Sequence, residues 1–257
     1  MLRYQIYILF LLITALLDAQ PSDTTLPAVR VPLEDCASID TAAYGIRITP
    51  KESYAAARAM VQNKKAALAK RYGGRKNRDS LHLAAKALLE EAIVNILIPF
   101  WYGTEWDFNG YSPAPRTGTI ACGYFVSTLM QHCGFNLNRY TIARQAPLYE
   151  ALTYELGDSV CRFETDYAGF AEAFKKNNGE GLYFAGLTCH VGFLLYRNGE
   201  LFFIHSSYMS PFRVVIEKAA CSAPFNATSE YVVARISGNQ RLLDRWISGA
   251  AIKTRMP

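Results

Sequence analysis

The sequence lacks several features that are typical of metal, redox and repeat proteins. None of its six cysteines lies in a Cys-x-x-Cys motif, so a zinc site or a thioredoxin-type site has no support. We find no internal repeat and no low-complexity tract. Beyond the first 20 residues, no apolar run approaches the roughly 20 residues that a membrane-spanning helix needs. We therefore expect no metal ion and no other cofactor.

The first 19 residues have the layout of a secretory signal peptide. Arg3 gives a basic start, an apolar run follows at 6–17, and Ala19 offers a small residue for cleavage. The run is short for a membrane-spanning helix, and a retained anchor is the alternative. No cysteine follows the cleavage point, which argues against a bacterial lipoprotein. We expect a secreted or periplasmic protein that has no membrane partner after cleavage.

The composition is that of a folded protein. Hydrophobic residues make up 51% of the 257 residues and aromatic residues 13%, which suffices for a core. The net charge is +5, and the basic residues gathered within 64–78 fit a solvated helix end better than a nucleic-acid site. We expect no nucleic-acid partner. The cysteines, some of which an exported protein could pair, are Cys36, Cys122, Cys133, Cys161, Cys189 and Cys221.

Hydrophobic periodicity predicts mostly helices first and then a run of strands. The expected helices, the first ended by Gly73-Gly74 and the second by Pro99, cover 54–71, 79–98, 122–133, 147–156, 167–176 and 240–247. The expected strands cover 181–187, 190–196, 201–206, 212–216 and 231–236. This order predicts an α+β fold with helices on one face of an antiparallel sheet. The expected parts are a signal peptide (1–19), a leader with N-terminal helices (20–98) and a main domain (99–257).

Cys122 is the candidate nucleophile because a helix is expected to begin there, after the turn-forming residues 118–121. The positive end of a helix stabilises a thiolate and lowers the pKa of a cysteine. Gly123 would leave room for a substrate to approach the sulfur. The alternative is a buried core cysteine, and we expect Cys133, on the apolar stripe of the same helix, to be one.

His190 and His205 fall on two strands that Asn198-Gly199, a two-residue hairpin signal, connects. This turn sets a register in which His205 faces Gly192 and His190 faces Ser207. The two histidines are then diagonal neighbours on one face, about 7–8 Å apart. The glycine leaves room for His205 to lean towards His190.

This placement gives His190 the role of base and His205 the role of the group that orients it, with Ser207 as the alternative orienting group. A thiol needs such a base to react well at neutral pH. The other reading is two histidines on a half-exposed strand face. His82 and His132 lie within expected helices and are expected to be surface residues.

Together these motifs resemble the NlpC-type cell-wall peptidases of the papain-like superfamily. The resemblance covers residues 99–216 and includes Cys122-Gly123, the His-Val-Gly strand at 190–192, the Ile-His-Ser segment at 204–206 and Pro-Phe-Trp-Tyr-Gly-Thr at 99–104. It implies a papain-like fold in which the nucleophile helix packs on an antiparallel sheet. It also implies cleavage of an amide bond in bacterial cell-wall peptides.

The sequence departs from the family at two places. The usual Asp before the nucleophile is Ala121, and Phe100 replaces the tyrosine of the aromatic segment. Tyr102 is the candidate to supply the missing hydroxyl, and Trp106 lies in a loop that faces substrate or simply packs on the surface. With Ser207, these two are the candidate substrate-binding residues.

We therefore expect an exported cysteine hydrolase with Cys122, His190 and His205 as catalytic residues and a peptide, from the cell wall by resemblance, as substrate. An acyltransferase that uses the same residues is one alternative. A non-catalytic domain that binds cell-wall peptides or a partner protein is another. The sequence leaves the oligomeric state open.

Overall fold

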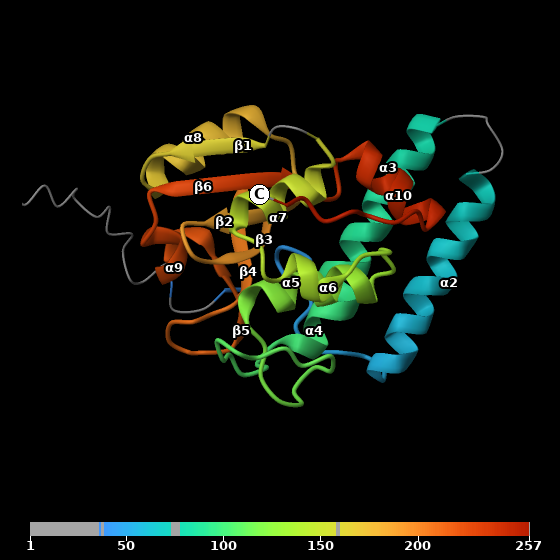
Figure 1. Cartoon of the computed structure of the whole chain (residues 1–257), viewed down its shortest axis with the longest axis horizontal. Coiled ribbons are helices and arrows are strands. Elements are labelled where there is room, and N and C mark those ends of the chain that lie inside the picture. The colour runs from blue at the N-terminus through green and yellow to red at the C-terminus, as the bar shows by residue number, and fades with distance from the viewer. Residues whose placement is uncertain (1–35, 37–38, 73–77, 158–159, 257) are drawn as a thin grey trace, which may run out of the picture. The chain divides into compact units, whose positions relative to one another are not determined.

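A six-stranded antiparallel sheet forms the centre of the fold (Figure 1). The computed structural model describes residues 36, 39–72, 78–157 and 160–256, which belong to one compact unit. The expected signal peptide (1–19), residues 20–35 of the expected leader and Gly73-Gly74 lie outside the described residues. The strands, in the spatial order β1-β6-β2-β3-β4-β5, are β1 (Cys161–Glu164), β2 (Gly181–Leu187), β3 (Val191–Arg197), β4 (Glu200–Ser206), β5 (Val214–Lys218) and β6 (Glu230–Arg235).

Helices cover both faces of this sheet. On one face lie η2 (Glu91–Leu97), α5 (Cys122–His132) and α7 (Pro147–Glu155), whose apolar side chains share a core with one side of the strands. On the other face, α8 (Tyr167–Asn177) and α9 (Ala223–Asn226) bring three phenylalanines onto a second cluster. The expectation of helices on one face was therefore wrong. Every residue of β2 is buried, and a strand buried on both sides needs cover on both faces.

The register of the central hairpin is as the turn predicted. Arg197 lies opposite Glu200 and Phe193 opposite Ile204, with Asn198 and Gly199 in left-handed conformations at the turn. Main elements missed by the periodicity are β1 and the short helix α6 (Arg139–Ile142). Both have four residues, too few to show a period.

Pro99 does not end the second helix. The segment runs from α3 (Arg78–Glu90) through the π-helix η2 into α4 (Ile98–Trp101), where the proline occupies one of the first two positions. The N–H of Ile98 bonds to the carbonyl of Ile93, five residues earlier, because the π-helical turn shifts the hydrogen-bond pattern. A proline at the start of the next helical turn needs no N–H partner, so the chain stays helical to Trp101.

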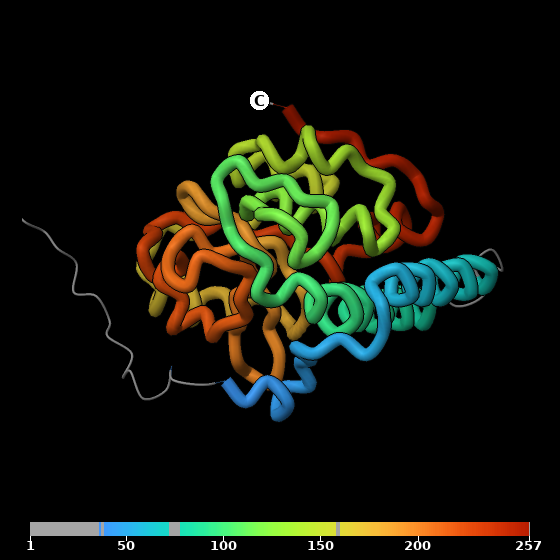
Figure 2. The backbone as a smooth tube through the Cα atoms, turned by 90° about the horizontal axis from the view of Figure 1, so that it is seen from below, coloured from blue at the N-terminus to red at the C-terminus, as the bar shows by residue number. Residues whose placement is uncertain are grey.

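The N-terminal helices belong to the same core as the sheet. Val61 of α2 (Tyr54–Tyr72) and Ile93 are buried in one cluster with Phe125 and Phe193. Figure 2 shows α2 alongside α3, and α10 (Gln240–Ser248) contacts both. Residues on the two sides of the expected boundary at 98/99 thus share one apolar core.

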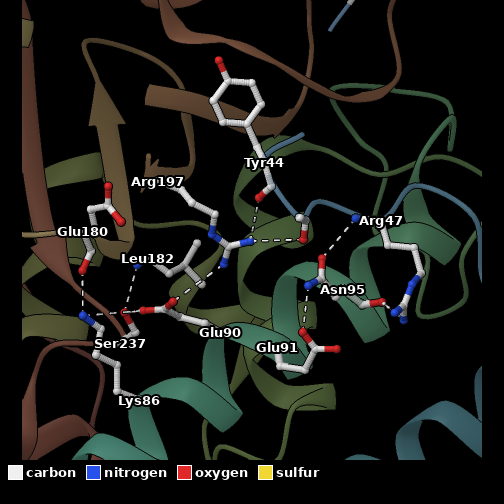
Figure 3. Close-up of polar contacts among 11 residues, drawn as sticks. Tyr44, Arg47, Lys86, Glu90, Glu91, Asn95, Glu180, Leu182, Arg197 and Ser237 are labelled. Carbon is white, nitrogen blue, oxygen red and sulfur yellow. Dashed lines mark hydrogen bonds and ion pairs between the residues drawn. The ribbon is translucent and has the colours of Figure 1, made fainter. Parts of the chain in front are cut away.

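Polar contacts also join these helices to the strands (Figure 3). The carboxylate of Glu90 accepts a hydrogen bond from Ser237 at 2.6 Å and pairs with Arg197 at 3.7 Å. Ser237 in turn accepts the backbone N–H of Leu182, and Arg197 donates to the carbonyl of Tyr44. The hairpin turn is therefore tied to both α3 and the segment that precedes α2.

His132 is buried rather than exposed, because α2 covers it. The Nε1–H of Trp101 donates to the hydroxyl of Tyr54 at 2.8 Å, and that hydroxyl is hydrogen-bonded to Nδ1 of His132 at 2.8 Å. Burial, with Arg58 and Arg139 nearby, lowers the pKa of His132 to about 4. His82 is also buried and lies 2.9 Å from Asp244, so neither histidine is the surface residue that we expected.

One disulfide joins Cys36 to Cys221, across 185 residues of sequence. The other four cysteines have free thiols, and Cys133 is fully buried as expected. Among the described residues, the helices are all too short or too polar to cross a membrane.

Replacing Tyr54 by phenylalanine should lower the free energy of unfolding by about 1–3 kcal/mol, because it leaves buried polar groups of Trp101 and His132 without a partner. Urea unfolding followed by circular dichroism measures the change. Tyr149→Phe is the matched control, since the Tyr149 hydroxyl forms no hydrogen bond among the described residues and its ring is half-buried. Equal stability of the two variants would contradict the prediction.

Candidate active site

Cys122 is the first residue of α5, preceded by Ala121 in an extended conformation. The first N–H groups of a helix have no partner within it, and here the backbone N–H groups of Cys122 and Gly123 act to lower the pKa of the thiol. Glycine is required at position 123 for packing, whereas we expected it to leave room for a substrate. A Cβ at this position would lie 2.5 Å from the carbonyl oxygen of Ala143, so only glycine fits.

A cavity of about 840 Å³ contains the side chains of both Cys122 and His190. Its described lining comes from five parts of the chain: the loop before α5, the start of α5, the segment from Ala143 to Glu150, the start of β3 with the residues before it, and the loop after β4. The described lining residues with polar or aromatic side chains are Trp106, Phe108, Asn109, Tyr111, Cys122, Tyr124, Arg144, Gln145, Glu150, Cys189, His190 and Tyr208.

The cavity lies at the end of the strands. The helix α5 packs on the face of the sheet that carries Phe193, whereas His205 shares the opposite face with Phe203. His190 precedes β3, and its neighbour Val191 donates a backbone hydrogen bond to the Cys122 thiol. Cys122 and His190 are thus brought to one cavity from the two sides of the sheet, at the point where β3 begins.

Three side chains from adjacent strands form a hydrogen-bonded chain that leads to the cavity. Nε2 of His190 lies 2.8 Å from Nδ1 of His205, and Nε2 of His205 lies 3.0 Å from the carboxylate of Glu217 on β5. Both histidines are buried, with 2% or less of their surface exposed. His205 thus contacts His190 directly.

The chain fixes the tautomers of both rings. The carboxylate of Glu217 only accepts, so Nε2 of His205 carries a proton and its Nδ1 is an acceptor. Nε2 of His190 must then donate to His205, which leaves Nδ1 of His190 with a lone pair. Among the described residues this nitrogen has no hydrogen-bond partner, so it is the atom of His190 that can take a proton from a thiol.

Gly192 makes the contact between the two histidines possible. A Cβ on Gly192 would lie 2.8 Å from Cβ of His205 and 2.6 Å from the ring of Phe203. Any larger residue would push His205 away from β3. The opening that the hairpin register predicted for His205 is therefore present.

Burial favours the uncharged forms of both Cys122 and His190. Burial raises the pKa of the Cys122 thiol to about 11, in spite of the backbone N–H groups that bond to it. Burial and the neighbouring His205 lower the pKa of His190 well below its ordinary value. Among the described residues, no hydrogen bond joins the Cys122 sulfur to His190. The expectation of a thiol with a lowered pKa at the helix start is thus not met, because desolvation outweighs the helix end.

The expected substrate-binding residues divide into one that lines the cavity and two that lie elsewhere. Trp106 lines it and contacts the ring of Tyr208, with ring centres 6.4 Å apart. Tyr102 is not among the described lining residues and packs against the main core. The Ser207 hydroxyl donates to the carbonyl of Met209 within its own loop, so it does not orient His190.

Three residues of the site escaped the sequence reasoning: Glu217, Glu150 and Tyr208. The hydrophobic pattern ended the expected strand at residue 216, whereas β5 continues to Lys218 and so includes Glu217. The ring of Tyr208 lies 5.0 Å from that of His190, and its hydroxyl bonds to Cys189. Burial, Cys189 and Cys122 raise the pKa of the Tyr208 hydroxyl. Extending the strand by its period of two would have put Glu217 on the same face as Val215. In the structure Val215 is the residue that pairs with His205.

No protein-family model matches the chain, and comparisons with curated proteins and with solved structures find no match either. Within the described residues, no group of three or more His, Cys, Asp and Glu side chains could hold a metal ion. The function therefore has to be inferred from the geometry of the cavity.

Alkylation of Cys122 by iodoacetamide should accelerate about tenfold per pH unit from pH 6 to 10, without levelling off, because its pKa is raised to about 11 and only the thiolate reacts. Mass spectrometry of the Cys122 peptide measures the rate, with the exposed Cys161 of the same sample as the comparison. A plateau below pH 9 would show instead that the thiol ionises readily in the folded protein.

Proposed function

We propose that this chain is an exported cysteine hydrolase of papain-like fold that cleaves an amide bond, with cell-wall peptide as the substrate. The observation that carries the proposal is the convergence of the Cys122 thiol and the chain His190–His205–Glu217 on one cavity. A nucleophile, a base with a free nitrogen and a group that fixes its tautomer are the parts that thiol catalysis requires.

Three further features support this reading. A helix with the candidate nucleophile at its first residue packs on an antiparallel sheet, as the resemblance to the papain-like superfamily implies. The Cys36–Cys221 disulfide is typical of proteins that fold in oxidising compartments, in keeping with export. Tyr208 brings a hydroxyl to the cavity, where the family has a tyrosine that this sequence lacks at position 100.

The reaction begins with two neutral groups. Nδ1 of His190 takes the proton of the Cys122 thiol as the sulfur attacks the amide carbonyl carbon, so that thiolate and imidazolium form together. The positive charge on His190 is stabilised through His205 by the carboxylate of Glu217. Because burial disfavours a free thiolate, this coupled transfer avoids a charged sulfur in the resting site.

The same groups complete the turnover. His190 returns its proton to the nitrogen of the leaving amine, the C–N bond breaks, and a thioester remains on Cys122. A water molecule, which gives a proton to His190, then attacks the thioester carbon. The C–S bond then breaks, and His190 returns this proton to the leaving sulfur, so that the products are a carboxylic acid and the free thiol. N–H groups at the start of α5 are available to stabilise the oxyanion in both steps.

Replacing Cys122 or His190 by alanine should reduce amide cleavage by at least about 10³-fold, since each removes a group that forms or breaks a bond. Purified cell wall is the substrate, and released peptides are identified by mass spectrometry. Cys161→Ala is the control, because this thiol is exposed on β1 and does not line the cavity. Turnover retained by both site variants would refute the proposal, and transfer of the acyl group to an added amine would identify an acyltransferase.

Glu217 is a positioning residue in this mechanism, so its replacement should lower kcat and leave KM nearly unchanged. Glu217→Leu removes the acceptor of the His205 proton and should cost about 10²-fold. Glu217→Gln keeps an accepting oxygen and should recover much of this loss. Glu230→Gln, at an exposed position on β6, is the control. Equal activity of the Leu variant and the original protein would exclude a role for Glu217.

A further inference from the structure

Glu150 is a buried carboxyl group in the wall of the cavity that contains Cys122. It lies in the first turn of α7, and only 1% of its surface is exposed. Its charge, when present, would raise the pKa of the Cys122 thiol, so the two side chains are electrostatically coupled. The hydrolytic mechanism described above gives Glu150 no task.

The hydrogen bonds of Glu150 are incomplete. The hydroxyl of Tyr154, one helical turn further on, donates to Oε1 at 3.4 Å. The second oxygen, Oε2, is buried and has no hydrogen-bond partner among the described residues. Buried polar atoms without partners are rare in folded proteins, and this one belongs to a residue that lines the cavity.

The uncharged form of Glu150 is favoured, because no described cationic group compensates its charge. Burial raises its pKa well above the ordinary value for a glutamate. Arg144 is the cationic residue in the described part of the lining, but its Nε donates to the carbonyl of Tyr140, and no described ion pair joins it to Glu150. Since Tyr154 donates to Oε1, the proton of the neutral carboxyl belongs on Oε2.

We propose that Glu150 is a catalytic residue that donates a hydrogen bond from its uncharged carboxyl group to the oxygen of the tetrahedral intermediate on Cys122. The inference rests on the proposed function. A negative oxygen develops one bond away from the carbon that the sulfur attacks, and a preorganised donor in a water-poor cavity stabilises it strongly. A carboxyl kept neutral by an apolar site is suited to this task, because it donates without adding charge.

The competing role for a buried carboxyl is to bind a cationic group of the substrate, which requires the ionised form. The two roles differ in what glutamine can do. An amide donates a hydrogen bond from the same place and so replaces a neutral donor, but it cannot neutralise a cation. Glu150→Gln and Glu150→Ala together therefore separate the two roles.

Two reagents that react with Cys122 provide a test independent of the natural substrate. p-Nitrophenyl acetate acylates a thiol through a tetrahedral intermediate, whereas iodoacetamide alkylates it by direct displacement with no oxyanion. Glu150→Ala should slow acylation of Cys122 about 10²–10³-fold and change alkylation little. Glu150→Gln should stay within about tenfold of the original protein in both reactions. Rates are read from the mass of the Cys122 peptide, with Glu172→Ala on the exposed side of α8 as the control.

Acylation unchanged in Glu150→Ala would overturn this role, and so would a Gln variant as slow as the Ala variant or an equal loss in both reactions. These outcomes leave the proposed function standing, since Cys122 remains a reactive nucleophile. In contrast, a Cys122 that is inert to both reagents in the original protein would overturn the proposed function and the role of Glu150 with it. Circular dichroism of each variant verifies that α7 is folded.

Discussion

The hydrogen-bonded chain from Glu217 through His205 to His190 crosses three neighbouring strands, and the arrangement of the site depends on it. It requires the registers of two strand pairs at once, because β4 must align His205 with both β3 and β5. It also requires a glycine at position 192, where a side chain would displace His205. Few arrangements of the sheet satisfy these conditions together. A shift of either strand register would break a hydrogen bond between Glu217, His205 and His190.

Desolvation decides the electrostatic state of this site. A helix start and three backbone N–H groups favour a thiolate at Cys122, yet burial raises the pKa of the thiol to about 11. Burial likewise favours the neutral forms of His190 and Glu150. A cavity of neutral groups avoids the cost of isolated buried charges, which the interior of a protein tolerates only when they are paired. In the proposed mechanism, charge develops only during the reaction, where the donors and the carboxylate of Glu217 stabilise it.

The sequence was sufficient for features that depend on local rules. A two-residue turn at Asn198-Gly199 determines its own register, so the meeting of His190 and His205 could be worked out in advance. The start of α5 at Cys122 followed from the residues around it. The positions of α7, α8 and α10 followed from their periodicity in the same way, within one or two residues.

Features that depend on distant parts of the chain could not be predicted. The loop before β5 has no short turn that fixes its register, so nothing local indicated that Glu217 reaches His205. The burial of His132 results from α2, which lies about 70 residues earlier in the sequence. We did not predict that α8 covers the second face of the sheet, because the hydrophobic pattern of a helix does not indicate on which side of a sheet the helix packs. The pKa of Cys122 depends on how much of the fold surrounds it, which no spacing of residues reveals.

The disulfide between Cys36 and Cys221 closes a covalent ring around nearly all of the machinery described above. The cavity lining from Trp106 to Tyr208 lies inside this ring, and so does Glu217. If a protease cut the backbone once at any exposed loop within the ring, the two pieces would remain bonded to each other. The strands that carry the histidines and the helix that carries the thiol would then stay in one molecule even after such a cut.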